Sequence, residues 1–234
     1  MVNKTLAAFW FCSVLMQVAL SHALTSAPAS THAAPGAGAM PALPSAPPDV
    51  RVIVSVPDQK LAVLVNGKVS RSYRVSTSRY GEGDALGSWR TPLGHLAVAH
   101  KIGGQAPVGS VFKGRQPTGE VLPPNAPGRD PIVSRIIWLR GMEQTNRHAY
   151  QRCIYIHGTP QESFLGRKAS FGCIRMRSTD VVDVYTYLNV GTDVSISAEP
   201  LGRAVRDLRG EVAKVLTRST VARVSSPGSS IRSE

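Results

Sequence analysis

Alternating apolar and polar residues predict strands in the first regular part of the chain. Val52, Val54 and Val56 fall on one face of an extended segment, and Ile53 falls on the other. A second alternating run ends at Asn66-Gly67, a dipeptide that favours positive φ at both positions of a tight turn. The pattern therefore predicts a β-hairpin followed by a returning strand.

The middle of the chain continues the strand pattern, and one helical segment interrupts it. The strand candidates are residues 51–56, 61–65, 69–75, 93–99, 132–139, 153–156 and 193–197. Helical spacing covers 179–188, with Ser178 as the N-cap candidate and Gly191 just past the end. Because strands and helices do not alternate, a doubly wound parallel sheet is disfavoured. We expect a mainly β domain over 50–198, a mixed β-sheet sandwich or barrel with one or two short helices.

Two turn-rich insertions separate the predicted strands. Residues 78–91 contain three glycines, and residues 103–131 are rich in glycine and proline. Long irregular loops in a compact β domain are often functional. We therefore expect these two insertions to form the walls of a cleft.

The N-terminal residues 1–23 carry the pattern of a secretory signal. Lys4 precedes a mostly apolar stretch from Leu6 to Leu20, and Ser21-His22-Ala23 fits the small-x-small rule for cleavage. A membrane anchor is the alternative, but the apolar stretch is shorter than the roughly 20 residues that span a bilayer. We expect an exported protein of the periplasm or cell wall.

The segments on either side of the domain have different compositions. Residues 24–49 are rich in proline and alanine, which predicts a semi-extended linker. Residues 199–234 predict a basic amphipathic helix and a disordered tail. The apolar positions at helical spacing are Leu201, Val205, Leu208, Val212 and Val215. The helix can pack on the domain, or its basic face can contact an anionic envelope surface.

The net charge of the chain limits the classes of partner that it is expected to bind. With 27 Lys and Arg against 15 Asp and Glu, the net charge is +12. Such an excess suits nucleic acid, an anionic membrane or an anionic polymer outside the cell. The signal segment disfavours nucleic acid, and no zinc-finger, helix-turn-helix or aromatic RNA-binding pattern is present. An envelope polymer is the favoured partner, and we expect a monomer.

A histidine and a cysteine are the candidate catalytic pair. His157 ends an apolar strand, and Cys173 follows Gly172 sixteen residues later. Cysteine catalysis needs a thiolate, and a neighbouring imidazole can take the thiol proton to leave an ion pair. Gly172 allows close approach of the backbone, so the amides of Gly172 and Cys173 are candidate donors to an oxyanion.

Spacing alone leaves other interpretations of these residues open. Cys173 can be a small buried apolar residue, and His157 can be a satisfied histidine at a strand end. A zinc site would need three or four ligands, for which only Cys153, His157, Cys173 and His148 lie near enough in sequence. A disulfide between Cys153 and Cys173 is a further alternative, and it would consume the proposed nucleophile.

Four segments resemble the L,D-transpeptidase catalytic domain, also called the YkuD-type domain, over roughly residues 51–197. The hairpin V-S-V-P-D-Q-K-L-A-V-L-V-N-G-K is similar to the first two strands of that family. The segment 90–94, R-T-P-L-G, resembles its Thr-Pro-x-Gly turn. The segments 154–159, I-Y-I-H-G-T, and 170–176, S-F-G-C-I-R-M, resemble its catalytic-histidine strand and its nucleophile loop.

This resemblance implies acyl transfer on peptidoglycan stem peptides with no metal or organic cofactor. Cys173 would attack the L-D bond of a tetrapeptide stem and release D-alanine, with His157 as acid and base. An amine acceptor would then take the acyl group to form a cross-link. Supporting positions are Gly172, Ser170 and Gly158 for the loop and the oxyanion, and Arg175, Thr159 and Phe171 for substrate binding. A structural ion pair of Arg175 remains an alternative.

The chain departs from the family at Phe171, where a second histidine is common. The aromatic ring can pack against the loop and shape the donor site instead. With the same site, water as acceptor would give an L,D-carboxypeptidase, and a protein amine would give attachment of a protein to peptidoglycan. A non-catalytic peptidoglycan-binding protein and an extracellular binder of anionic polymers are the remaining alternatives.

Overall fold

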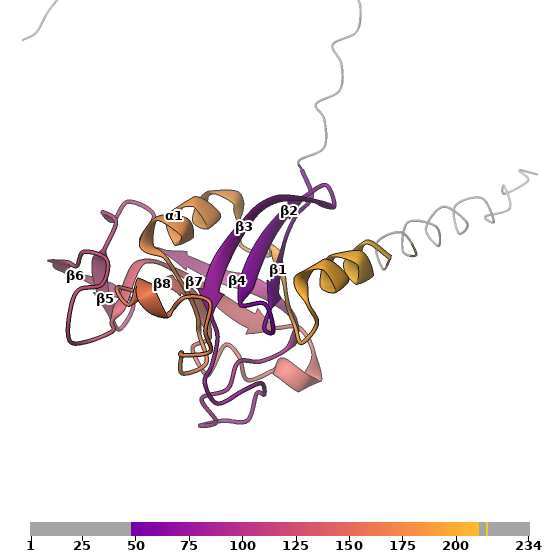
Figure 1. Cartoon of the computed structure of the whole chain (residues 1–234), viewed down its shortest axis with the longest axis horizontal. Coiled ribbons are helices and arrows are strands. Elements are labelled where there is room, and N and C mark those ends of the chain that lie inside the picture. Colours follow the sequence, from indigo (N-terminus) through magenta and orange to yellow (C-terminus); the bar gives the residue numbers. More distant parts are fainter. Residues whose placement is uncertain (1–47, 211–213, 215–234) are drawn as a thin grey trace, which may run out of the picture. The chain divides into compact units, whose positions relative to one another are not determined.

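A computed structural model of the chain describes residues 48–210 and 214 (Figure 1). The predicted signal segment, nearly all of the linker and most of the predicted C-terminal tail lie outside the described residues. Among the described residues, none of the helices has the length and the apolar character that spanning a bilayer requires. The predicted domain over 50–198 lies wholly inside the described part.

The elements follow one another as short strands with little helix between them. The strands are β1 (Val50–Ser55), β2 (Lys60–Val65), β3 (Lys68–Ser76), β4 (Gly94–Ile102), β5 (Ser110–Lys113), β6 (Gln116–Val121), β7 (Ile132–Gly141), β8 (Tyr155–Gly158), β9 (Ile174–Met176) and β10 (Asp193–Ser197). The helices are η1 (Gln144–Asn146), η2 (Glu162–Phe164), α1 (Ser178–Tyr187) and a helix over residues 201–210.

Strand pairing closes most of the sheet on itself. The order is β4-β10-β1-β2-β3-β9-β8-β7, and the pairing of β4 with β7 joins its two ends. The pairs β1–β10 and β8–β9 are parallel, whereas the other pairs are antiparallel. The hairpin β5–β6 adds to β7 outside this ring. The expectation of a mainly β, mixed, barrel-like sheet is confirmed.

The first hairpin forms as its sequence predicts. Asn66 and Gly67 both have positive φ, at 50° and 72°, and Val50 lies opposite Val65. Val52 and Val54 enter the main apolar core inside the sheet. β3 then pairs with β9 only through its last two residues, which leaves residues 68–74 exposed or half-buried.

Helix α1 covers the sheet beside β7 and β8 (Figure 1). It spans Ser178–Tyr187, close to the predicted range 179–188. Its buried residues Val181 and Val184 join the main core. The N-cap expectation was wrong, because Ser178 is the first helical residue and Arg177 precedes it. The Ser178 amide donates to the Glu162 carboxylate at 3.0 Å, so a side chain from η2 satisfies the helix N-terminus.

The helix over residues 201–210 covers the outer face of β1 and β2 (Figure 1). Ala204, Val205 and Leu208 pack on Ile53 and Leu64, which alternate with the core-facing valines. Packing of this helix on the domain is therefore confirmed for its described residues. Contact of its basic face with an anionic surface stays a prediction.

The second insertion contains strands that its composition conceals. Residues 103–131 were expected to be irregular, yet β5 and β6 form a hairpin whose turn has positive φ at Gly114 and Arg115. β5 pairs with β7 at Val111↔Val133. The expectation failed because the strands are short and sit among glycines and prolines, where alternation is hard to detect.

We predict that Leu208→Ala lowers the free energy of unfolding by about 2 kcal/mol, because it removes buried apolar contacts with β1 and β2. Arg206 is exposed on the same helix, so Arg206→Ala should change it by less than about 0.5 kcal/mol. Urea unfolding of the two variants measures both values. Equal values would show that docking of this helix does not stabilise the sheet.

Candidate active site

The parallel pair β8–β9 brings His157 and Cys173 to one face of the sheet. Ile156 lies opposite Ile174, and His157 lies opposite Arg175. Residues two apart on a strand share a face, so Tyr155 and His157 face the same way. Cys173 immediately precedes β9 and continues the face of Arg175. The two residues of the predicted catalytic pair are therefore diagonal neighbours on adjacent strands.

The Cys173 thiol is hydrogen-bonded to the backbone that leads into β8. Its Sγ donates to the Cys153 carbonyl at 3.3 Å and accepts from the Tyr155 amide at 3.4 Å. Cys153 itself has a φ of 55°, in the left-handed region that L residues other than Asn and Asp rarely adopt. The predicted strand over 153–156 accordingly starts later, at Tyr155, and Cys153 lies in the turn that aims its carbonyl at the sulfur.

The His157 ring is fixed by the next residue of its own strand. Nδ1 lies 2.8 Å from the Gly158 carbonyl oxygen, which can only accept. The Nδ1 atom therefore carries the proton, and Nε2 presents its lone pair. Gly158 supplies this contact through its backbone alone.

Burial keeps both members of the pair neutral at pH 7. Burial lowers the pKa of His157 to about 4, against the raising effect of the Gly158 carbonyl, and the Arg175 charge lowers it further. Burial raises the pKa of the Cys173 thiol to about 11, although the Tyr155 amide and Arg175 favour the thiolate. The resting site thus holds a thiol and an unprotonated imidazole rather than the ion pair expected from the residue types.

Ser170 ties the nucleophile loop together. Its Oγ donates to the Cys173 carbonyl at 2.6 Å and accepts from the Gly172 amide at 3.2 Å. Because Ser170 engages the Gly172 amide, the Cys173 amide remains the candidate oxyanion donor of the two. Gly172 has a φ of 117°, and a Cβ there would lie 3.3 Å from the Arg90 carbonyl oxygen.

Arg175 forms a buried ion pair. Its Nη2 lies 2.7 Å from Oδ2 of Asp130, and Arg175 is only 7% exposed. The Thr159 hydroxyl donates to the other oxygen of Asp130. Both Arg175 and Thr159 are therefore engaged within the protein, which favours the ion-pair interpretation over substrate binding. No motif in the sequence pointed to Asp130, which lies in the second insertion.

Phe171 packs against the first insertion and stays 48% exposed. Its ring centroid lies 5.9 Å from that of Tyr80 and 6.0 Å from that of Trp89. The Arg79 guanidinium lies 4.6 Å from its centre. The residue at the position of the usual second histidine thus extends an exposed aromatic surface beside the nucleophile loop.

A second buried ion pair fixes the first insertion to the turn before β8. Arg152 Nη1 lies 3.0 Å from Asp84 Oδ1, and both side chains are almost fully buried. Arg152 also donates to the carbonyls of Gly83 and Arg90. Arg152 therefore holds the Arg90 backbone, which lies close to Gly172. Arg152 also directly precedes Cys153, whose carbonyl oxygen accepts from the Cys173 thiol. Sequence reasoning missed this pair, whose partners are 68 residues apart.

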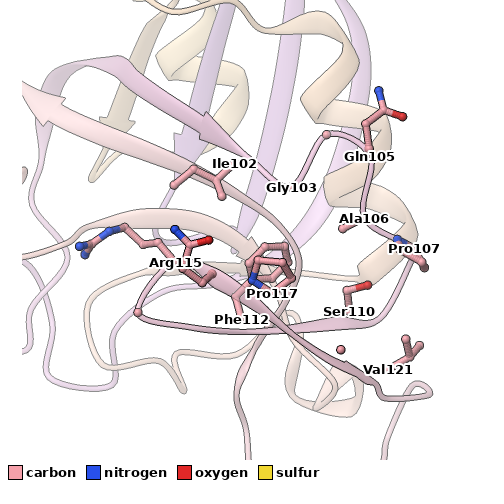
Figure 2. A pocket seen from close by; sticks show the side chains of 14 residues that line it. Ile102, Gly103, Gln105, Ala106, Pro107, Ser110, Phe112, Arg115, Pro117 and Val121 are labelled. Carbon is pink, nitrogen blue, oxygen red and sulfur yellow. The ribbon is translucent and has the colours of Figure 1, made fainter. Parts of the chain in front are cut away.

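Ile102 and residues of the second insertion line an open pocket of about 750 Å³ (Figure 2). Phe112 lines the pocket and belongs to the same apolar cluster as Tyr155. The half-buried Cys173 packs against this cluster. We expected the two insertions to wall one cleft together, but none of residues 78–91 is among the residues that line this pocket. In the described part of the chain, no group of three or more His, Cys, Asp or Glu could hold a metal, and Cys153 and Cys173 are both free.

Comparison with known proteins decides the family. The family model of the L,D-transpeptidase catalytic domain, YkuD, matches residues 49–196, which is more than half of the chain. The chain belongs to the YkuD family of L,D-transpeptidase catalytic domains. The resemblance drawn from the hairpin, the Thr-Pro turn, the histidine strand and the nucleophile loop is thereby confirmed.

One curated YkuD relative and two solved structures show the range of similarity. The chain is 32% identical over 152 residues to "Putative L,D-transpeptidase YqjB" of Bacillus subtilis (strain 168), covering 64% of this chain and 73% of that protein. The L,D-transpeptidases of Mycobacterium smegmatis and Xylanimonas cellulosilytica each share 19% identity, with TM-scores of 0.42 and 0.43. These matches cover 64% and 66% of this chain. The chain spans 59% and 63% of those two solved chains.

We predict that Asp84→Ala lowers the free energy of unfolding by about 3 kcal/mol, because it leaves the Arg152 charge buried without its partner. Glu82 in the same insertion pairs with Lys168 at the surface, so Glu82→Ala should cost less than about 1 kcal/mol. Thermal and urea unfolding measure both. A cost for Asp84→Ala no larger than for Glu82→Ala would contradict the prediction.

The raised pKa of Cys173 predicts slow alkylation at neutral pH. Only the thiolate reacts with iodoacetamide, so its rate should rise about tenfold per pH unit between pH 7 and pH 10. Mass spectrometry of the Cys173 peptide measures this rate without interference from Cys153. A plateau near pH 8 would show that the thiol has an ordinary pKa.

Proposed function

We propose that this YkuD domain is a cell-wall L,D-transpeptidase that uses Cys173 as its nucleophile and peptidoglycan tetrapeptide stems as acyl donors. The observation that carries the proposal is the placement of Cys173 and His157 on one face of adjacent parallel strands, within a domain of this family. The acyl group is transferred to an amine of a second stem, which forms a cross-link.

In the first step, Cys173 attacks the carbonyl between the L-centre of meso-diaminopimelate and the terminal D-alanine. His157 takes the thiol proton on Nε2, which is unprotonated because Nδ1 donates to the Gly158 carbonyl. Since the thiol pKa is high and the imidazole pKa is low, proton transfer accompanies the attack rather than preceding it. The thiol leaves its resting partner, the Cys153 carbonyl, by rotation of the cysteine side chain.

The groups around the sulfur support the charged species of this step. The positive charge of Arg175 favours the thiolate and is held in place by Asp130. The Cys173 amide is the donor proposed for the oxyanion of the tetrahedral intermediate. Protonated His157 then gives its proton to the nitrogen of D-alanine, the C–N bond breaks, and a thioester on Cys173 remains.

In the second step, a side-chain amine of another stem attacks the thioester. His157 takes a proton from the attacking nitrogen and returns one to the departing thiolate, which restores the neutral pair. Water as acceptor at the same thioester would give a shortened stem instead of a cross-link. Export to the periplasm or cell wall is part of the proposal, because its substrate lies there, and the charge of +12 suits an anionic wall polymer.

We predict that the purified protein releases D-alanine from a disaccharide-tetrapeptide and forms cross-linked dimers, both detected by mass spectrometry. Cys173→Ala should abolish both products, and His157→Ala should reduce their rate by at least about a hundredfold. Cys153→Ala is the matched control, since Cys153 contributes its backbone carbonyl to the thiol, and it should retain most of the activity.

Three outcomes would contradict parts of this proposal. Dimer formation that survives in Cys173→Ala would exclude the cysteine mechanism. Release of D-alanine with a shortened stem and no dimer, even with excess amine, would identify a carboxypeptidase. Binding to sacculi without any turnover or acylation of Cys173 by a carbapenem would identify a non-catalytic peptidoglycan-binding protein.

A further inference from the structure

The pocket lined by the β5–β6 hairpin and the candidate nucleophile both border one apolar cluster. Phe112 lines the pocket and contacts the cluster that includes Tyr155, and Cys173 packs against that cluster. Tyr155 in turn donates its amide to the Cys173 sulfur. A ligand attached to the sulfur therefore lies close enough to extend into this pocket.

Arg115 is the one charged side chain among the residues that line the pocket. Figure 2 shows it at one end, with its side chain running away from Gln105 and Pro107 at the other. The groups that influence its guanidinium are Tyr155, Cys153 and Tyr150, and none of them is a carboxylate. Within the described part of the chain, Arg115 forms no ion pair. Its positive charge is thus unmatched, and the residues that line the pocket include no acid.

Two aromatic side chains orient the Arg115 guanidinium. It lies 4.8 Å from the centre of the Trp138 ring, and Nη1 lies 3.4 Å from the Tyr155 hydroxyl oxygen. Trp138 is backed by Tyr150, which stacks on it at 4.2 Å and 5°. A guanidinium has five N–H donors in a planar fork, and most remain after one contact with a hydroxyl. Such an oriented fork suits two parallel hydrogen bonds to a carboxylate.

One residue, Tyr155, links this charge to the sulfur through two contacts of 3.4 Å. The backbone amide of Tyr155 binds Cys173, and the hydroxyl at the other end binds Arg115. In meso-diaminopimelate, three methylenes similarly separate the L-centre, whose carbonyl is attacked, from the second centre with its free carboxylate. We therefore expect one extended diaminopimelate residue to bridge the sulfur and Arg115.

We propose that Arg115 binds the side-chain carboxylate of the donor diaminopimelate, and that it selects stems in which this carboxylate is free. This inference rests on the proposed function, because it takes Cys173 as the point of attack. The ligand class is an acidic peptide. The amidated stem, in which a neutral carboxamide of the same shape replaces the carboxylate, is the ligand that Arg115 discriminates against.

The binding test uses the full chain with Cys173→Ala, which prevents turnover, and two tetrapeptide stems that differ only in this carboxylate or carboxamide. Calorimetry should give a dissociation constant at least roughly tenfold lower for the acid. Arg115→Gln in the same background should abolish the preference, and Arg115→Lys should keep only part of it. Lys113→Gln is the matched control, since Lys113 is exposed on the same hairpin and does not line the pocket.

Equal binding of the acid and the amide by the Cys173→Ala protein would overturn the inference. A preference that persists in Arg115→Gln, or that is lost equally in Lys113→Gln, would also overturn it. Thermal unfolding verifies that each variant is folded, and the exposed Arg115 should tolerate both substitutions.

Turnover by the wild-type protein separates this inference from the proposed function. Release of D-alanine from both stems at the same kcat/KM would remove the role of Arg115 and leave the transpeptidase proposal intact. Arg115-dependent binding of the acid without release of D-alanine would support the role of Arg115 and contradict the transpeptidase proposal.

Discussion

The parallel pairing of β8 with β9 is the constraint on which the candidate site depends. A parallel pair cannot be joined by a tight turn, so the chain must cross over between His157 and Cys173. That crossover contains Ser170 and Gly172, whose contacts shape the approach to the sulfur. Ring closure by β4 and β7 fixes β8 on its other side. The imidazole and the thiol therefore sit on a rigid surface, although they belong to segments of different local structure.

Two buried ion pairs join the long insertions to this surface. Asp84 in the first insertion binds Arg152, just before Cys153, and Asp130 in the second binds Arg175, just after β9 begins. Each pair fixes an irregular segment close to a catalytic candidate, because Arg152 lies in the turn that leads into β8 and Arg175 lies in β9, which Cys173 precedes. Both arginines also lower the pKa of Cys173 against the effect of burial. The same charges thus serve packing and reactivity, and neither arginine is free to act as an exposed substrate contact.

Local pattern predicted most of the longer strands and failed where the strands are short or the contacts are long-range. β1, β2, β3, β7 and β10 lie close to their predicted positions. β9 has only three residues, and β5–β6 lies in a glycine- and proline-rich segment, so neither gave a periodic signal. The cysteine and the histidine were identifiable from their motifs. Asp84 and Asp130 were not, because only the folded chain brings each beside its arginine.

The exposed part of β3 has a consequence for the protein at high concentration. β3 pairs with β9 through only Val75 and Ser76, so the preceding residues leave one side of the strand open. Open edges invite pairing with a second copy and promote aggregation. Lys68, Arg71 and Arg74 lie along this edge and are exposed. Two copies that approached edge to edge would bring these cations together, so part of the positive charge of the chain protects its own solubility.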